Sequence, residues 1–298
     1  MLFVQLDPKL ATLIERLFAG WQLTPVSSPE RSPDIKIVFF AASNLPDIPS
    51  GLSLTQFDVA DGGRCYIAGD EYYLQFENSL LRLQQGSPVI ISVLISSPTD
   101  AELARVTSSA VCAALRRFGM FELHGAGVVV PGSEAGVLIV GPSGSGKSTL
   151  TSQLARAGWG YLSDDELLLS LSGEEIEARG FRSFFALAAN ETSNLKSCFE
   201  PASVFDAPRA ERVTPRFLLF TAVSGTNETQ LQELTQAETM ARLIRACPWA
   251  TYDTAIAAAN LQLLSRLAHQ AKGFNLMAGT DLLEPEQASR ILSSVCRS

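Results

Sequence analysis

The chain has 298 residues, of which 46% are hydrophobic and 18% are charged, a balance typical of globular domains with enough apolar side chains for a core. Its formal net charge of -8 at pH 7 argues against a broad basic surface, so we expect no nucleic-acid partner. The apolar runs are too short to cross a bilayer and no secretory leader is recognisable, so we expect a cytoplasmic protein with no membrane partner. The cysteines are scattered, odd in number and never spaced as a metal-binding pair, which is typical of reduced thiols; they are Cys65, Cys112, Cys198, Cys247 and Cys296.

Residues 1–118 are predicted to form a smaller N-terminal α+β domain, which we interpret as a substrate or partner module. Apolar residues at helical spacing predict a first helix over residues 8–18. A capping box, with Thr99 as N-cap and Glu102 three residues later, predicts a second helix that ends before Gly119. Apolar runs between turn-forming stretches predict strands over residues 35–41, 65–68, 72–76 and 89–95.

Residues 119–298 are predicted to form an α/β domain. It begins with two strands over residues 121–130 and 137–140, followed by a glycine-rich loop, a helix over 148–157 and a strand over 160–163. Further buried strands are predicted over residues 167–171, 176–181 and 216–223. The C-terminal part is predicted to be helical, with a capping box at Thr235 and Glu238, over residues 236–246, 254–270 and 285–296.

The glycine-rich loop matches the pattern GxxxxGK[ST] at every specified position. In this pattern the glycines let backbone N–H groups turn onto phosphate oxygens, the lysine reaches the β- and γ-phosphates, and the hydroxyl ligates Mg²⁺. An apolar strand leads into the loop and a helix leads out of it, and the helix N-terminus adds its positive dipole end. The sequence therefore predicts a site for ATP with Mg²⁺, formed by Gly141, Pro142, Ser143, Gly144, Ser145, Gly146, Lys147, Ser148 and Thr149.

Two adjacent carboxylates, Asp164 and Asp165, follow Lys147 by 17 and 18 residues. A helix of about ten residues leads roughly 15 Å away from the loop, and a return strand of about five residues covers roughly 16 Å. A right-handed β-α-β crossover then sets both carboxylates back at the level of the loop. One of them could hold the metal and the other could accept a proton from an attacking hydroxyl. The alternative interpretation is a solvated turn.

His124 is a third candidate. If the first two strands of this domain pair as a hairpin with Val130 near Val137, His124 falls opposite Ser143, beside the loop. A histidine there could bond a phosphate oxygen or tune an aspartate, and the alternative is a histidine satisfied within the strand. One or two later arginines could clamp a transferring phosphate, and the sequence does not choose among Arg179, Arg182, Arg209, Arg212 and Arg216.

The stretch from Leu123 to Phe185 resembles the catalytic domain of the HPr kinase/phosphorylase family, which has a phosphoenolpyruvate-carboxykinase-like fold. The matching segments are Leu123 to Val128, Gly141 to Ser148, and Ser163 to Asp165. In that family a histidine precedes the loop by a β-hairpin, and two adjacent aspartates follow the loop lysine at this distance. The fold class that the resemblance implies is α/β, a P-loop kinase domain of the HPr kinase C-terminal type beside the smaller N-terminal domain.

The resemblance implies a Mg·ATP-dependent kinase that transfers the γ-phosphoryl group to a hydroxyl of a protein, peptide or small metabolite. A serine hydroxyl is the first candidate. It implies Asp164 as the general base that takes the hydroxyl proton, with Lys147 and His124 as further catalytic residues. It also implies that Ser148 and Asp165 hold Mg²⁺. The tendency of the family to assemble is compatible with a homo-oligomer.

The chain departs from the HPr enzymes at Thr149, where they carry an acidic residue, and in their later signature, of which residues 178–181 keep only a part. We therefore do not expect HPr itself to be the acceptor. The alternative function is a non-catalytic, ATP-binding regulatory protein of the same fold. A GTP-type or motor-like P-loop NTPase fits less well, because such proteins usually place the second acidic motif much further along the chain.

Overall fold

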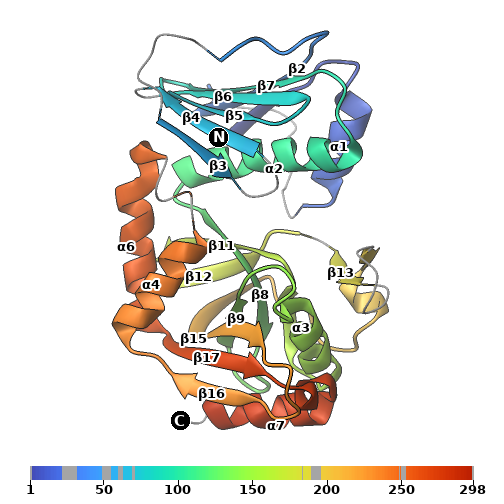
Figure 1. The fold of residues 1–298 in the computed structure, drawn as a ribbon, viewed down its shortest axis with the longest axis vertical. Helices are drawn as coiled ribbons and strands as arrows, with labels where there is room; N and C mark the ends of the chain where they lie inside the picture. Colours follow the sequence, from blue (N-terminus) through green and yellow to red (C-terminus); the bar gives the residue numbers. More distant parts are fainter. Residues whose placement is uncertain are drawn as a thin grey trace. The chain divides into compact units, whose positions relative to one another are not determined.

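The structure, a computed structural model, describes residues 2–21, 32–48, 55–59, 63–68, 71–182, 184–188, 196–247, 249 and 253–296. The chain forms two compact units of mixed α/β structure, one of Met1–Phe118 with Thr251–Ala257 and one of Gly119–Ala250 with Ala258–Ser298 (Figure 1). The sequence assigns residues 251–257 to the second domain, whereas here they belong to the first unit. Within that unit Asp253 forms ion pairs with two arginines of a helix, which accounts for the difference.

The first unit is built on a sheet with the strand order β1-β2-β7-β6-β5-β4-β3. Strands β1, β2 and β7 run parallel, and the remaining neighbours are antiparallel. Helices α1 (Ala11–Ala19) and α2 (Asp100–Arg117) complete the unit. The strands are β1 Leu2–Gln5, β2 Ile35–Ala41, β3 Thr55–Val59, β4 Gly63–Ala68, β5 Glu71–Gln75, β6 Ser79–Gln84 and β7 Val89–Ile95.

Strands β2 and β7 are confirmed at their predicted bounds, and β4 and β5 agree with prediction to within two residues. Strands β1, β3 and β6 are not predicted. In β6 the reason is its burial pattern, because Ser79, Leu80 and Leu81 are buried in succession and do not alternate between a buried and an exposed face. Such a short run carries no clear period of two.

Helix α2 begins at the predicted cap, with the Thr99 hydroxyl accepting from the Glu102 N–H at 3.2 Å. The Glu102 carboxylate has hydrogen-bond partners outside the capping box that the sequence predicts. It is buried and accepts from the Asn78 N–H and the Ser79 hydroxyl, each at 2.7 Å. The carboxylate therefore ties α2 to the start of β6, because a buried carboxylate needs donors wherever the fold supplies them.

The second unit is built on an eight-stranded sheet around the long strand β8 (Phe121–Val129). The first half of β8 pairs antiparallel with β11, and its second half pairs antiparallel with β9 on one side and β10 on the other. Strand β15 runs parallel to both β9 and β17. The other strands are β9 Ala135–Val140, β10 Gly160–Ser163, β11 Glu166–Ser172, β12 Glu175–Gly180, β15 Arg212–Val223, β16 Gln230–Glu233 and β17 Lys272–Ala278, with a separate ladder of β13 Phe185–Ala188 and β14 Lys196–Phe199.

Helices cover both faces of this sheet. On one face, Leu154 of α3 and Leu292 of α7 share a buried cluster with Leu219 of β15. On the other face, Arg242 of α4 donates to the Asn275 side chain of β17 at 2.9 Å. Figure 1 shows α4 and α6 on the side of the sheet away from α3 and α7. The four helices are α3 Lys147–Arg156, α4 Gln236–Ala246, α6 Thr254–Gln270 and α7 Pro285–Cys296.

Helices α4, α6 and α7 are confirmed at their predicted bounds, and the capping box of Thr235 and Glu238 forms in full. Strand β17 is not predicted, because Gly273 and Asn275 are residue types depleted in strands. The structure explains the glycine: a Cβ at Gly273 would lie 2.1 Å from Thr239 Oγ1 of α4. Close packing of helix on strand therefore overrides strand propensity at this position.

Across the described ranges, no helix combines the length and the apolar character needed to span a membrane. Among the described cysteines, Cys65, Cys112, Cys247 and Cys296 are thiols outside any disulfide bond, and the side chain of Cys198 lies outside the described residues.

We expect Asp253→Ala to lower the free energy of unfolding of the first unit by about 3–5 kcal/mol, the usual cost of removing one partner of a buried ion pair. The Asp253 carboxylate is 1% exposed and accepts from Arg117 Nη2 at 2.9 Å. The control is the more exposed pair of Arg82 and Glu71, where Arg82→Ala should cost less than about 1 kcal/mol. Urea unfolding followed by circular dichroism measures both variants, and equal losses would contradict this account.

Candidate functional site

The glycine loop, defined as Gly141–Gly146, joins the end of β9 to the start of α3. Gly144 and Gly146 have φ angles of +81° and +89°, in the left-handed region that glycine enters without strain. At Gly141 an added Cβ would lie 2.8 Å from the Thr221 carbonyl oxygen. The backbone therefore follows a path that requires glycine at three positions of the motif.

The glycine loop is fastened to the neighbouring strand β15. Ser145 Oγ lies 3.0 Å from Thr221 Oγ1, and both side chains are buried. Because β9 and β15 run parallel, the loop lies at the carboxyl ends of two parallel strands, where open α/β sheets bind ligands. The N–H groups in the first turn of any helix have no acceptor within the helix, and the dipole favours an anion there. The loop and the start of α3 together fit a phosphate group.

Lys147, the first residue of α3, is 6% exposed. Its Nζ donates to the carbonyl oxygens of Gly141 at 2.7 Å and Pro142 at 3.0 Å. The same Nζ lies 3.1 Å from His124 Nε2. The ammonium is thus held over the glycine loop, where a phosphate oxygen would compete with these three acceptors for its protons.

The next residues of the motif differ in orientation. Ser148 is half-buried, and its Oγ donates to the Asp164 carbonyl oxygen at 3.4 Å. Thr149 is exposed, as are Pro142 and Ser143 in the outer part of the loop. Ser148 therefore links the start of α3 to the backbone of Asp164, whereas Thr149 is exposed to solvent.

Asp164 and Asp165, here called the acid pair, lie between β10 and β11, two successive strands that both pair with β8. Strand β10 pairs with β8 before them and β11 pairs with β8 after them. Between the two ladders the Asp165 carbonyl accepts from the Gly125 N–H at 2.9 Å. On its other side Gly125 pairs with Val140, the last residue before the glycine loop. The chain from β9 through α3 to β10 thus crosses over β8 and brings the acid pair next to the loop.

The two carboxylates of the acid pair differ in exposure and partners. Asp164 is 2% exposed, and its Oδ1 accepts from the Tyr161 hydroxyl at 3.1 Å. Burial, followed by the charge and hydrogen bond of Asp164, raises the pKa of Tyr161, so this hydroxyl stays protonated and remains a donor. The Asp165 side chain is 25% exposed, and its oxygens lie 3.6 Å from His124 Nδ1 and 3.5 Å from Arg182 Nη1. Asp165 is the more accessible of the two carboxylates.

His124 lies beside the glycine loop, but the register of the hairpin is not the predicted one. The structure pairs Val128 with Val137, where the prediction pairs Val130 with Val137. The turn is shorter than predicted because β9 begins two residues earlier, at residue 135. His124, one residue before the Gly125–Val140 pair, is therefore level with residue 141 and not residue 143.

The contacts of His124 define its tautomer. The Lys147 ammonium can only donate, so His124 Nε2 accepts from it. In the neutral ring the proton then sits on Nδ1, which faces the Asp165 carboxylate. A single imidazole thus joins the loop lysine to the acid pair, and this Lys147–His124–Asp165 contact is the centre of the candidate site.

The five candidate arginines separate into two groups. Arg179 and Arg212 lie near the Glu177 carboxylate of β12, and Arg216 pairs with Glu175 of the same strand. Arg182 instead contacts Asp165 and donates to Glu166 at 3.2 Å. The Arg209 guanidinium donates to the Arg182 carbonyl oxygen at 3.0 Å, which holds that part of the backbone in place.

Tyr161 and Glu166 belong to this site although no sequence motif singles them out. Burial raises the pKa of Glu166, and the neighbouring Arg182 opposes the shift. Burial alone would lower the pKa of Arg182, but Glu166 and then Asp165 outweigh it, so that pKa is raised and the guanidinium stays charged. The one available signal is position, since both residues flank the acid pair within three residues.

The donor set around Ser148 suits Mg²⁺ and a triphosphate. The part of the chain that the structure describes contains no group of three or more His, Cys, Asp or Glu side chains arranged to hold a metal. Mg²⁺ needs less from the protein, because it keeps several waters and is bound through one or two carboxylates together with substrate phosphates. Ser148 and the acid pair could supply such ligands, and the absence of a Cβ at Gly141 lets the start of the loop pack closely against Thr221 of β15.

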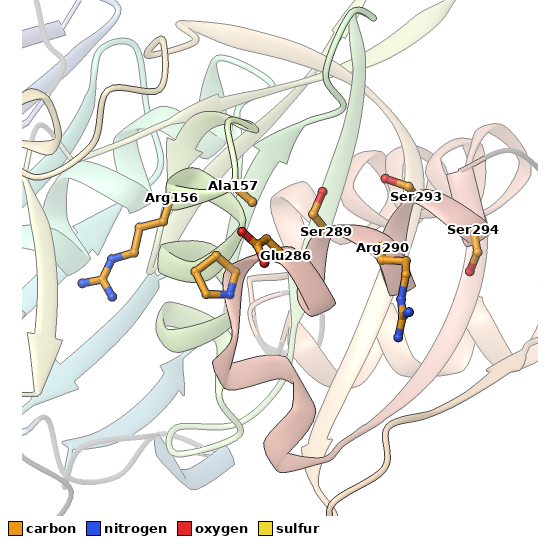
Figure 2. Close-up of a pocket in the computed structure, with 8 residues that line it drawn as sticks. Arg156, Ala157, Glu286, Ser289, Arg290, Ser293 and Ser294 are labelled. Carbon is orange, nitrogen blue, oxygen red and sulfur yellow. The ribbon is translucent and has the colours of Figure 1, made fainter.

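A cavity of about 830 Å³ lies at the opposite end of α3. It is lined by residues of α3 and α7, and Figure 2 shows its two arginines, Arg156 and Arg290, directed away from each other. Neither the glycine loop nor the acid pair lines it. The cavity is therefore separate from the candidate site.

No protein-family model matches the chain, and no curated protein matches its sequence. Among solved structures the chain is similar to the HPr(Ser) kinase/phosphatase from Coxiella burnetii, with 12% sequence identity and a TM-score of 0.35. The match covers 59% of this chain and 96% of that one. A likeness this distant carries no argument about function, which therefore rests on the residues of the site.

Gly141→Ala should weaken ATP binding at least about tenfold, or about 1.4 kcal/mol, because the new methyl group would meet the Thr221 carbonyl oxygen. Gly132→Ala is the control: this glycine has a φ of +72° in the hairpin turn, and an added Cβ meets nothing within 4 Å. It should cost stability and leave ATP affinity unchanged. Isothermal titration calorimetry with Mg·ATP measures both, and equal effects on affinity would refute the role of the loop.

Proposed function

We propose that the second unit is a Mg·ATP-dependent phosphotransferase that moves the γ-phosphoryl group to a hydroxyl acceptor on a protein, peptide or small metabolite. The observation that carries this proposal is the contact of both Lys147 and Asp165 with His124. A phosphate-binding lysine and a carboxylate that can take a proton are the two groups that phosphoryl transfer requires side by side. The contact that each makes with His124 supports phosphoryl transfer over nucleotide binding alone.

In the proposed reaction the acceptor oxygen forms a bond to the γ-phosphorus while the bond from that phosphorus to the bridging oxygen of ADP breaks. The proton of the acceptor hydroxyl passes to a carboxylate of the acid pair. Lys147 neutralises charge on the phosphate oxygens. Mg²⁺, when bound, would supply further neutralisation between the phosphates. His124, whose Nδ1 lies 3.6 Å from Asp165 Oδ1, helps to orient that carboxylate.

The burial of the two aspartates favours roles as base and metal ligand that are the reverse of those that the family resemblance implies. That resemblance implies Asp164 as the base and Asp165 as the metal ligand. A base must come within about 3 Å of the hydroxyl that it deprotonates, and Asp165 is the more accessible carboxylate. Asp164 is buried, and its carbonyl contacts Ser148. We therefore propose Asp165 as the base and Asp164 with Ser148 as the metal-binding side.

Lys147→Ala should lower ATP affinity by at least about tenfold and abolish turnover, because the charge facing the β- and γ-phosphates is lost. Lys272→Ala removes an exposed lysine at the start of β17 in the same unit and should change neither. Calorimetry and a coupled assay for ADP measure the two effects. Unchanged ATP binding in Lys147→Ala would rule out a nucleotide site at the glycine loop.

Asp165→Asn should keep Mg·ATP binding and lose about 10²- to 10⁴-fold in phosphoryl transfer, the range of general-base contributions. Asp164→Asn should instead raise the Mg²⁺ concentration needed for half-maximal ATP binding at least about 10- to 100-fold, the cost of changing even an outer-shell partner of a metal site. Magnesium titrations and single-turnover assays separate the two. The opposite pattern would restore Asp164 as the base.

The acceptor can be identified by incubating the protein with γ-labelled ATP and a lysate of its own host, followed by identification of the labelled species. The wild-type chain should label a discrete species, and Lys147→Ala should not. Intact ATP binding with no labelled species in any fraction would favour the non-catalytic regulatory protein.

A further inference from the structure

Arg182 occupies a distinct place among the charged groups of the site. Its Nη1 lies 3.5 Å from Asp165 Oδ2, whereas His124 contacts the other oxygen, Oδ1. Its Nε donates to Glu166 Oε2 at 3.2 Å. The acid pair thus has a lysine of the glycine loop on one side, through the imidazole, and a guanidinium on the other.

The position of Arg182 is supported on several sides. The Glu166 side chain that it contacts is 14% exposed, and the guanidinium lies 6.0 Å from the centre of the Phe184 ring. Its own carbonyl accepts from Arg209, on a segment that is tied to β10 through Tyr161. A guanidinium held in this way loses little conformational freedom when it binds a ligand.

Arg182 has both the chemistry and the exposure to contact a phosphoryl group. A guanidinium carries five N–H donors in a planar fork that fits two oxygens of a phosphoryl group. About a third of the Arg182 side chain, 32%, is exposed. Its guanidinium is therefore accessible to a ligand that lies beside Asp165.

We propose that Arg182 binds the phosphoryl group as it transfers from ATP to the acceptor. The proposal rests on the proposed function, and it selects one arginine from the five that the sequence leaves open. In this arrangement Lys147 binds the phosphoryl oxygens from the side of the glycine loop and Arg182 binds them from the side of the base. Charge on these oxygens is spread over the group in the transition state, so cations on both sides stabilise it.

The test uses the full chain and a planar mimic of the transferring group, Mg·ADP with aluminium fluoride, so that no acceptor is needed. In the wild type, aluminium fluoride should tighten the retention of ADP at least about tenfold. Arg182→Gln should lose most of that gain and bind Mg·ADP alone as the wild type does. Arg182→Lys should recover little of it, because an ammonium lacks the planar fork. Fluorescence of a labelled ADP measures each affinity.

Arg179→Gln is the matched control, since this arginine is half-exposed and contacts Glu177 on β12. It should retain the full gain from aluminium fluoride. If Arg182→Gln also retains it, Arg182 does not touch the transferring group and the inference is overturned while the proposed function stands. If the wild type shows no gain, both the inference and the proposed transfer fail. Normal Mg·ADP binding by Arg182→Gln shows that the variant is folded.

Discussion

The candidate site depends on strand β8, because this one strand has the glycine loop on one side and the acid pair on the other. Gly125 of β8 pairs with Val140 at the end of β9 and donates to the Asp165 carbonyl across its opposite edge. The residue before it, His124, then reaches Lys147 with one ring nitrogen and Asp165 with the other. Antiparallel pairing sets these positions through a backbone spacing of about 4.8 Å between strands. The chemistry of the site follows from that spacing.

The charges of the site alternate from the glycine loop outward. The order is Lys147, His124, Asp165, Arg182 and Glu166, and each residue contacts the next. Alternation offsets the cost of partly burying charged groups, because each has an opposite or hydrogen-bonding neighbour. It also keeps both a cation and a carboxylate beside the place where a phosphoryl group would transfer. A carboxylate without these neighbours would repel the negatively charged phosphate.

Local patterns allowed much of this arrangement to be predicted. Helices α4, α6 and α7, with caps or clear apolar spacing, were predicted at their bounds, and the strand–loop–helix around the motif GPSGSGKS was recognisable from its glycines. Features that depend on distant contacts were not predictable. Strand β17 contains a glycine because Thr239 of α4 packs against it, and β15 begins earlier than its apolar run because an irregularity accommodates Pro215. The buried hydrogen bond from the Tyr161 hydroxyl to Asp164 was not predictable either, although the two residues are close in sequence, because no motif singles out Tyr161.

The most direct test of the account is a crystal structure of the chain with Mg²⁺ and a non-hydrolysable ATP analogue. The account predicts the β- and γ-phosphates within the glycine loop and Mg²⁺ about 2.0–2.1 Å from Ser148 Oγ. It also predicts that a single hydroxyl fits between an Asp165 carboxylate oxygen and the γ-phosphorus, with the hydroxyl oxygen about 3–3.5 Å from the phosphorus. A nucleotide bound elsewhere, or an acid pair turned away from the γ-phosphate, would contradict it.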